Sequence, residues 1–313
     1  MTVSAIKIIE PGEIQGLPDK DMPQLVVPSP KHLFAERASR LEYLAKDGEL
    51  KGWLEFCAML AKAQSEVIDK VSVASVDDSL ITGSLKNHIP PLSISTWKVN
   101  EEWSTVYQKF TEQLATNKLP QKATESIAAF SKLSPDDQAK QVIAFLNADE
   151  ASVRPEYAPF IGAALQLIWT KRAEQLAAYT EFYKGESSLC PVCGSHPIAS
   201  VVRTGDRDAN RFMACSLCAS EWYGPRARCT NCETPIEVSI LGESQEDSVQ
   251  GECCDECHGY LKLMLQSKDP MMEVMADDLA TIGLDIALSN EGFQRTGRNM
   301  YFLSGGEQET KTS

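Results

Sequence analysis

The chain has 313 residues, enough for about two domains, and nine of its ten cysteines lie in one segment, from Cys190 to Cys257. Hydrophobic residues at 43% and charged residues at 24% are ordinary for a globular protein, so a small disulfide-stapled secreted protein is excluded. Forty-four acidic and 30 basic residues give a net charge of -14, which disfavours nucleic acids and anionic membranes as partners.

The N-terminal sequence has neither a secretory signal nor a twin-arginine pair. The most apolar stretch, 158–169, is too short to span a membrane and predicts a buried core helix, so we expect no membrane insertion. We therefore expect a cytoplasmic protein with reduced thiols. Clustered cysteines in that compartment indicate metal ligands or redox chemistry rather than structural disulfides.

Residues 1–28 are rich in proline and glycine and predict an extended N-terminal arm. Across 29–185, apolar residues recur at spacings of three and four, which predicts an all-α domain of about five or six helices. Serine followed by proline marks helix starts at Ser29 and Ser134. The last helix of this domain is expected over about 155–183.

After the helical domain the sequence changes to short β-like runs separated by turn residues. We expect a first cysteine unit at 186–226 and a second at 227–267. A C-terminal helix that packs back is predicted within 268–303, followed by a disordered tail at 304–313. Its expected apolar stripe is Met271, Met275, Leu279, Ile282 and Ile286.

Four C-x-x-C pairs occur in the cysteine segment, and their spacing repeats. Twenty-one residues separate the first pair from the second and the third from the fourth, and each cysteine of the first two pairs recurs 39 positions later. This is an internal duplication. Two such turns can present four thiolates tetrahedrally to one ion, and Gly194 suits the positive φ that the turn favours. The predicted ligands are Cys190, Cys193, Cys215 and Cys218 for one site, and Cys229, Cys232, Cys254 and Cys257 for the other.

The remaining cysteines and two nearby histidines fall outside these sets. Cys253 is interpreted as a spare thiol of open role, because only its neighbour Cys254 reproduces the 21-residue gap. Cys57 lies on an apolar helical face and is expected in the core. His196 and His258 lie close to C-x-x-C pairs but are surplus where four cysteines already complete a tetrahedron.

The two copies differ in charge although their cysteines match. Residues 190–218 carry a net charge of +1, whereas 229–257 contain eight acidic residues and no lysine or arginine. The acidic face either meets a partner or is simply solvated. No catalytic motif accompanies it, and Asp269, Asp277 and Asp278 are expected on a solvated face or as N-terminal helix charge, so an enzyme is not supported.

Several motifs together resemble one protein family. They are Cys190-Pro-Val-Cys193-Gly-Ser195, Arg211-Phe-Met-Ala-Cys215-Ser-Leu-Cys218, Cys229-Thr-Asn-Cys232-Glu233, Cys254-Asp-Glu-Cys257 and Ala276-Asp-Asp-Leu-Ala280, with the N-terminal pattern Pro28-Ser-Pro-Lys-His-Leu-Phe34. In this order they resemble the formate dehydrogenase accessory protein family, FdhE. His258 stands where that family often has glycine.

The resemblance implies a non-enzymatic cytoplasmic chaperone that is needed to mature respiratory formate dehydrogenase. Such a factor would contact the catalytic subunit before its export by the twin-arginine route. The resemblance also implies that the cysteine units are rubredoxin-like and bind two metal ions per chain, iron first and zinc as the alternative. The expected fold class is α+β: an all-α N-terminal domain, two tandem rubredoxin-like (zinc-ribbon-like) β units and a C-terminal helix. A rubredoxin-type electron-transfer protein is the alternative function, and a homodimer stays open.

Overall fold

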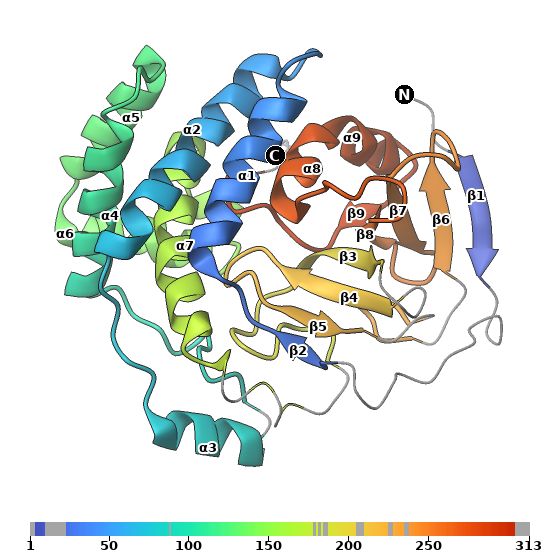
Figure 1. The fold of residues 1–313 in the computed structure, drawn as a ribbon, viewed down its shortest axis with the longest axis horizontal. Helices are drawn as coiled ribbons and strands as arrows, with labels where there is room; N and C mark the ends of the chain where they lie inside the picture. The colour runs from blue at the N-terminus through green and yellow to red at the C-terminus, as the bar shows by residue number, and fades with distance from the viewer. Residues whose placement is uncertain are drawn as a thin grey trace, which may run out of the picture.

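The computed structural model describes residues 4–303 except 10–22, 88, 178–179, 181–182, 184–186, 205–209, 225–227 and 235–237, and for 4–9 the backbone alone. The arm expected at 1–28 thus lies partly, and the tail expected at 304–313 wholly, outside the described residues. Figure 1 shows most of the helices on one side of the molecule and the strands on the other.

The helical part begins at Pro30, directly after Ser29, as the sequence predicts. Its helices are α1 (Pro30–Leu44), α2 (Lys51–Val67), α3 (Asp78–Asn87), α4 (Glu101–Leu114), α5 (Gln121–Ser131), α6 (Pro135–Leu146) and α7 (Ala158–Glu174). Short 3-10 turns are η1 (Ile68–Lys70), η2 (Glu150–Ser152) and η3 (Pro155–Tyr157). Ser134 caps α6 as expected, because its hydroxyl accepts from the Asp137 backbone N–H at 3.2 Å.

Helix α7 is the central helix of this part. Every residue from Ala158 to Thr170 is buried, which confirms the predicted core helix. A helix that is buried on all sides must be covered on all sides, and α1, α2, α4 and α6 all pack against it. The helix ends at Glu174 instead of continuing to residue 183. Directly after the helix, the Gln175 side chain accepts from the Val76 backbone N–H and donates to the Ala74 carbonyl. These bonds attach the end of α7 to the segment between η1 and α3.

The strands that the structure describes form one nine-stranded sheet in the order β1-β6-β7-β8-β3-β4-β5-β2, with β9 beside β8. They are β1 (Ser4–Ile9), β2 (Leu25–Val26), β3 (Pro197–Arg203), β4 (Asn210–Cys215), β5 (Glu221–Tyr223), β6 (Val238–Gly242), β7 (Val249–Cys254), β8 (Gly259–Leu265) and β9 (Gln294–Arg295). The duplication is visible in this list, since β6, β7 and β8 repeat β3, β4 and β5 about 39 positions later.

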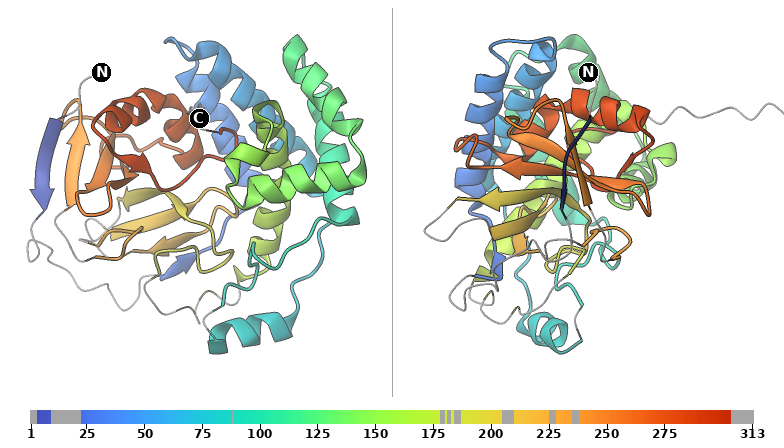
Figure 2. Two further views of the ribbon diagram at one scale, coloured as in Figure 1. Left: turned by 180° about the vertical axis from the view of Figure 1, so that it is seen from behind. Right: turned by 90° about the vertical axis from the view of Figure 1, so that its right-hand side faces the viewer.

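The two copies join through a parallel pair, β3 beside β8, which runs from Ala199 opposite Lys262 to Val202 opposite Leu265. The N-terminal segment adds a strand at each end of the sheet. β1 pairs with β6 of the second copy, and β2 pairs with β5 of the first. Both copies therefore share one continuous sheet (Figures 1 and 2).

The prediction of a single C-terminal helix within 268–303 is wrong. Two short helices replace it, and they break at Thr281, with φ −110° and ψ 31°: α8 (Val274–Ala280) and α9 (Ile282–Asn290). The buried Lys262 Nζ donates to the carbonyls of Asp278 (2.9 Å) and Thr281 (3.1 Å), which a continuous helix would use internally. Met271 and Ile286, predicted on an apolar stripe, are instead 77% and 59% exposed.

Asp277 and Asp278 were expected on a solvated face, but they are buried, with exposed fractions of 4% and 1%. Asp277 lies 2.6 Å from the guanidinium of Arg40 on α1, and Asp278 lies 3.2 Å from Lys262 Nζ on β8. Asp269 also pairs with Arg40. These ion pairs attach the C-terminal helices to α1 and to the sheet, and a buried charge is tolerated because it is paired. Among the described residues, no helix has the length and apolarity needed to cross a bilayer.

Candidate metal centres

The first cysteine group, which we call site 1, lies where two tight turns meet. Cys190 and Cys193 lie in the turn before β3, Cys215 ends β4, and Cys218 lies in the turn between β4 and β5. The Sγ atoms of Cys190 and Cys218 are 3.5 Å apart, as are those of Cys193 and Cys215. All four cysteines are buried.

The second group, site 2, repeats this arrangement in the second copy. Cys229 and Cys232 lie in the turn before β6, Cys254 ends β7, and Cys257 lies in the next turn. The Sγ atoms of Cys229 and Cys257 are 3.7 Å apart, and those of Cys232 and Cys254 are 3.8 Å apart. Cys232 and Cys257 are only half-buried.

The sulfur spacing matches metal–thiolate ligation. Within each group the four ligand atoms all lie within 4.8 Å of one another. Four sulfurs held tetrahedrally at about 2.3 Å from an ion are themselves about 3.8 Å apart, whereas a disulfide needs about 2.05 Å. The structure thus brings the eight predicted cysteines into two groups that could each hold one ion. All-thiolate donors suit zinc and iron alike.

The residue after each C-x-x-C pair has a positive φ. The values are 80° at Gly194, 56° at Ala219, 59° at Glu233 and 53° at His258. At the first pair the Gly194 N–H donates to Cys190 O at 2.8 Å and closes the turn. Four occurrences at equivalent positions show that the turn itself demands this conformation, which costs a non-glycine residue about 1 kcal/mol. His258 adopts it too, so the departure from the family's usual glycine leaves the turn intact.

Hydroxyl groups face three of the eight sulfurs, a feature that the sequence reading missed. They occupy the second position after a C-x-x-C pair: Ser195 Oγ 3.3 Å from Cys193 Sγ, Ser220 Oγ 3.3 Å from Cys218 Sγ, and Thr234 Oγ1 3.2 Å from Cys232 Sγ. At the fourth pair, glycine's backbone N–H donates to Cys257 Sγ instead, at 3.4 Å. Serine or threonine at the same offset in three of four pairs was the signal that could have revealed them. A hydroxyl that donates to a thiolate stabilises its charge.

Ionisation of these thiols differs within each group. The Thr234 hydroxyl lowers the pKa of Cys232 to about 6. Burial raises the pKa of Cys190 well above its ordinary value. For Cys215, burial also opposes ionisation, but hydrogen bonds from the neighbouring cysteines outweigh it and hold the pKa well below the usual range. Some ligands are thus poised as thiolates, whereas others must release a proton when an ion binds.

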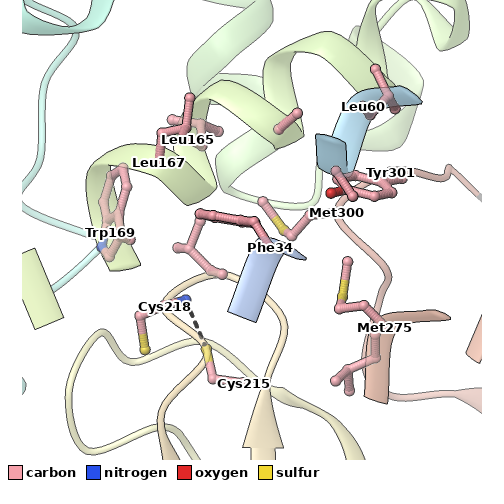
Figure 3. Packing of buried hydrophobic residues seen from close by; sticks show 14 of the residues in the cluster. Phe34, Leu60, Leu165, Leu167, Trp169, Cys215, Cys218, Met275, Met300 and Tyr301 are labelled. Carbon is pink, nitrogen blue, oxygen red and sulfur yellow. Dashed lines mark hydrogen bonds between the residues drawn. The ribbon is translucent and has the colours of Figure 1, made fainter. Parts of the chain in front are cut away.

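Site 1 is tied directly to the helical part. The backbone N–H groups of Leu92 and Ile94 donate to the carbonyls of Val192 (2.9 Å) and Cys193 (3.0 Å). From α7, Gln166 Nε2 donates to the carbonyl of Ser216, which lies between two ligands. Figure 3 shows Cys215 and Cys218 within the core cluster, which also contains Phe34 and Trp169. Gln166 in turn accepts from Arg37 and Gln64 side chains, each at 3.2 Å.

The other residues singled out from the sequence lie outside both groups. Cys57 lies on α2 and is fully buried in the hydrophobic core, as predicted. Cys253 is fully buried on β7 but belongs to neither group, and burial raises its pKa far above the ordinary value. His196 and His258 are exposed and also belong to neither group.

A helical part joined to one mixed sheet, with two duplicated four-cysteine groups at the sheet's turns, defines an α+β protein with two groups of thiols that could each hold a metal ion. The chain belongs to the FdhE family. Models of the N-terminal, central and C-terminal FdhE domains match residues 22–184, 189–226 and 227–302. This confirms the family resemblance of the sequence motifs.

Relatives match over nearly the whole chain. The FdhE homolog of Haemophilus ducreyi is 33% identical over 312 residues, covering 96% of this chain and 99% of the relative. The homolog of Yersinia enterocolitica is 32% identical over 293 residues, covering 93% and 94%. The crystal structure of the FdhE protein from Pseudomonas aeruginosa is similar with a TM-score of 0.82 at 27% identity, covering 91% of this chain and all of that one.

Proposed function

We propose that this protein is a non-catalytic accessory factor for the maturation of formate dehydrogenase. In this proposal it binds the enzyme's catalytic subunit in the cytoplasm, before export. The observation that carries the proposal is the match of all three FdhE domain models, in order, from residue 22 to residue 302. The two four-cysteine groups support it, because they give the clustered cysteines a structural and metal-binding role that needs no catalytic activity.

The proposed division of the chain follows the duplication. Residues 29–185 form the helical domain, 186–226 and 227–267 form two rubredoxin-like units, and 268–303 form the C-terminal segment. The boundary between the central and C-terminal family models, at residues 226 and 227, supports this division. Because β3 pairs with β8, the two units are proposed to fold together rather than independently.

We propose that each group of cysteines holds one metal ion, with iron first and zinc as the alternative. An iron ion bound by four thiolates supplies one-electron chemistry. The chain itself supplies the thiolates, orients them by contacts with neighbouring hydroxyls and by backbone N–H donors, and excludes water from site 1 by burial. Metal analysis of protein from its own host, together with its visible absorption, tests the assignment. Colourless protein with two zinc ions would remove the iron assignment and the redox role.

Co-purification tests the docking proposal. The tagged chain is co-expressed with the formate dehydrogenase catalytic subunit, and we expect recovery of that subunit with the tag. A tagged unrelated protein of similar net charge is the control, because a charge of -14 promotes nonspecific capture of basic proteins. Recovery no better than this control would contradict the docking proposal. Light scattering on the same sample determines whether the chain is a monomer or a homodimer.

Electron transfer of the rubredoxin type is a second candidate, favoured by the half-buried sulfurs of Cys232 and Cys257. An electron carrier needs its centre near the surface, and site 2 meets this condition better than site 1. The two candidates are separated by deleting the gene and supplying a Cys232→Ser variant. An accessory factor of purely structural action restores formate dehydrogenase activity with this variant if the fold is intact, whereas an electron carrier working through site 2 does not.

A further inference from the structure

A cavity of about 550 Å³ lies at the junction between the helical part and site 1. Residues from the segment before α4, the end of α6, the site 1 turns and the C-terminal segment line it, and no cysteine is among them. A cavity of this size accommodates a small organic ligand. It is therefore a place where a ligand could bind without displacing a metal.

Arg298 lines this cavity and is held in a fixed position. Its Nη2 donates to the carbonyl of Leu146 at 3.0 Å, and its guanidinium carbon lies 4.5 Å from the centre of the Phe145 ring. Its Nη1 is buried, with almost no accessible surface, and has no hydrogen-bond partner among the described residues, so a ligand reaches this nitrogen only when the side chain shifts. The guanidinium is thus oriented in advance but keeps unused donor capacity.

Arg298 also makes no direct ion pair with a described carboxylate. No carboxylate oxygen among the described residues lies within 4.0 Å of its guanidinium nitrogens. Every other arginine that the structure describes does have such a partner: Arg37, Arg40, Arg154, Arg172, Arg203, Arg211, Arg228 and Arg295. Burial lowers the pKa of Arg298 to about 10, and the charge of Glu150 offsets this only in part. The charge of Arg298 is therefore the one in this set that an incoming anion would compensate.

Neutral donors accompany this charge. Ser93, Ser95, Ser216 and Asn147, which carry hydroxyl or amide groups, are among the residues that line the same cavity. Arg295 lines it as well, but its guanidinium is already paired with acidic side chains. A guanidinium surrounded by hydroxyl and amide groups is suited to phosphate and carboxylate oxygens, which accept several charge-assisted hydrogen bonds at once.

We propose that this cavity binds a small-molecule oxyanion, a phosphate or a carboxylate, through Arg298. Glu150 lies in the same cavity and repels such a ligand, so it limits the affinity and the charge of what binds. The site adds a ligand to the proposed accessory function and does not depend on it.

Isothermal titration of the full-length, metal-loaded chain tests the proposal, with inorganic phosphate and acetate as separate probes and sodium chloride at matched ionic strength as the reference. We expect saturable binding of at least one probe, and the stronger probe identifies the chemical source. Arg298→Gln should weaken that binding about tenfold or more, because charge-assisted hydrogen bonds are lost. Glu150→Gln should tighten it, because a like charge is removed. Opposite signs alone would also follow from the change in net charge, so a variant with the same charge change outside the cavity is needed.

Arg154→Gln is the matched control, because Arg154 is exposed and paired with Glu156 outside the cavity, and its affinity should equal that of the unsubstituted chain. If circular dichroism shows that Arg298→Gln does not fold, Arg298→Lys and Glu150→Gln decide. Absence of saturable binding by both probes would overturn the proposal, as would equal affinity in the Arg298 variant and the unsubstituted chain. Neither result would affect the co-purification with the catalytic subunit.

Discussion

Sites 1 and 2 have the same ligand spacing but different surroundings. All four cysteines of site 1 belong to the main hydrophobic core, and three of them have no exposed surface. At site 2, Cys229 and Cys254 lie outside that core cluster, and the other two cysteines are half-buried. The duplication thus preserved the local turn, whereas the tertiary contacts made one site internal and the other peripheral.

The difference has a clear physical origin. The helical part packs against the first copy, where Leu92, Ile94 and Gln166 bond the backbone beside the ligands. The second copy lies farther from these helices (Figure 1) and contains eight acidic residues but no lysine or arginine from 229 to 257. We therefore expect an ion at site 1 to stabilise the whole fold, and an ion at site 2 to stabilise mainly its own unit.

Removing one ligand from each site should give the largest contrast. Cys190→Ala and Cys229→Ala should each lower the metal content by about one ion per chain. Cys190→Ala should also cost several kcal/mol of global stability, on the order of a structural metal's contribution, because its loss opens the main core. Elemental analysis and thermal unfolding measure the two effects. Equal losses of stability in the two variants would contradict the expected difference between site 1 and site 2. Unchanged metal content in either variant would refute the grouping of the ligands.

Metal release should separate the sites kinetically. With excess chelator we expect a fast phase from site 2 and a slow phase from site 1, because an exposed sulfur can be attacked without unfolding the core. Absorbance of a colorimetric chelator follows both phases. Cys229→Ala should remove the fast phase, and Cys190→Ala the slow one. A single phase in the unsubstituted chain, or the reverse assignment in the variants, would contradict this ranking.

The bond from α7 to site 1 should affect metal release from that site and not from site 2. Gln166→Leu leaves the Ser216 carbonyl without this donor in a buried place and also removes the acceptor of Arg37 and Gln64, at a cost of about 1–3 kcal/mol for each group left unpaired. The slow phase of metal release should become faster, with the fast phase unchanged. Gln108→Leu is the control, because the Gln108 side chain bonds the exposed Glu112, and the change should alter stability by less than about 0.5 kcal/mol. Acceleration of both phases by Gln166→Leu would show that the two sites are coupled.

The smallest effect is expected at the positive-φ turns. Ala219→Gly at site 1 and His258→Gly at site 2 should each raise the free energy of unfolding by up to about 1 kcal/mol, since glycine adopts this conformation without strain. Ala58→Gly, inside α2, should lower it by about 1 kcal/mol and serves as the control. Urea unfolding measures all three. A loss of stability in both turn variants would show that the turns are not strained.

Features specified by short spacings could be predicted from the sequence. The starts of α1 and α6 follow from a serine before a proline, and the buried core helix follows from a continuous apolar run. The pairing of eight cysteines into two groups follows from a repeated gap. Each of these features depends on residues close in the chain or on a regular period, so no knowledge of the fold is needed.

Features specified by distant partners could not be predicted. The break at Thr281 depends on Lys262, which reaches the helix carbonyls only because β8 lies beneath them. The burial of Asp277 depends on Arg40, 237 positions away in the chain. From the sequence alone, acidic residues on a helix are expected to be solvated, and for Asp277 this expectation was wrong. Burial of a charge is tolerated only with a partner, and the local sequence does not reveal that partner.

The sequence by itself determined how the eight cysteines are grouped and the turn that presents them, because two cysteines separated by two residues are brought together by local backbone geometry. Only the tertiary structure decided that the two copies share one sheet, that α7 bonds the first, and that the second stays at the periphery. Parallel pairing of β3 with β8 and packing of α7 on site 1 join segments far apart in the chain. No spacing within either copy encodes those contacts.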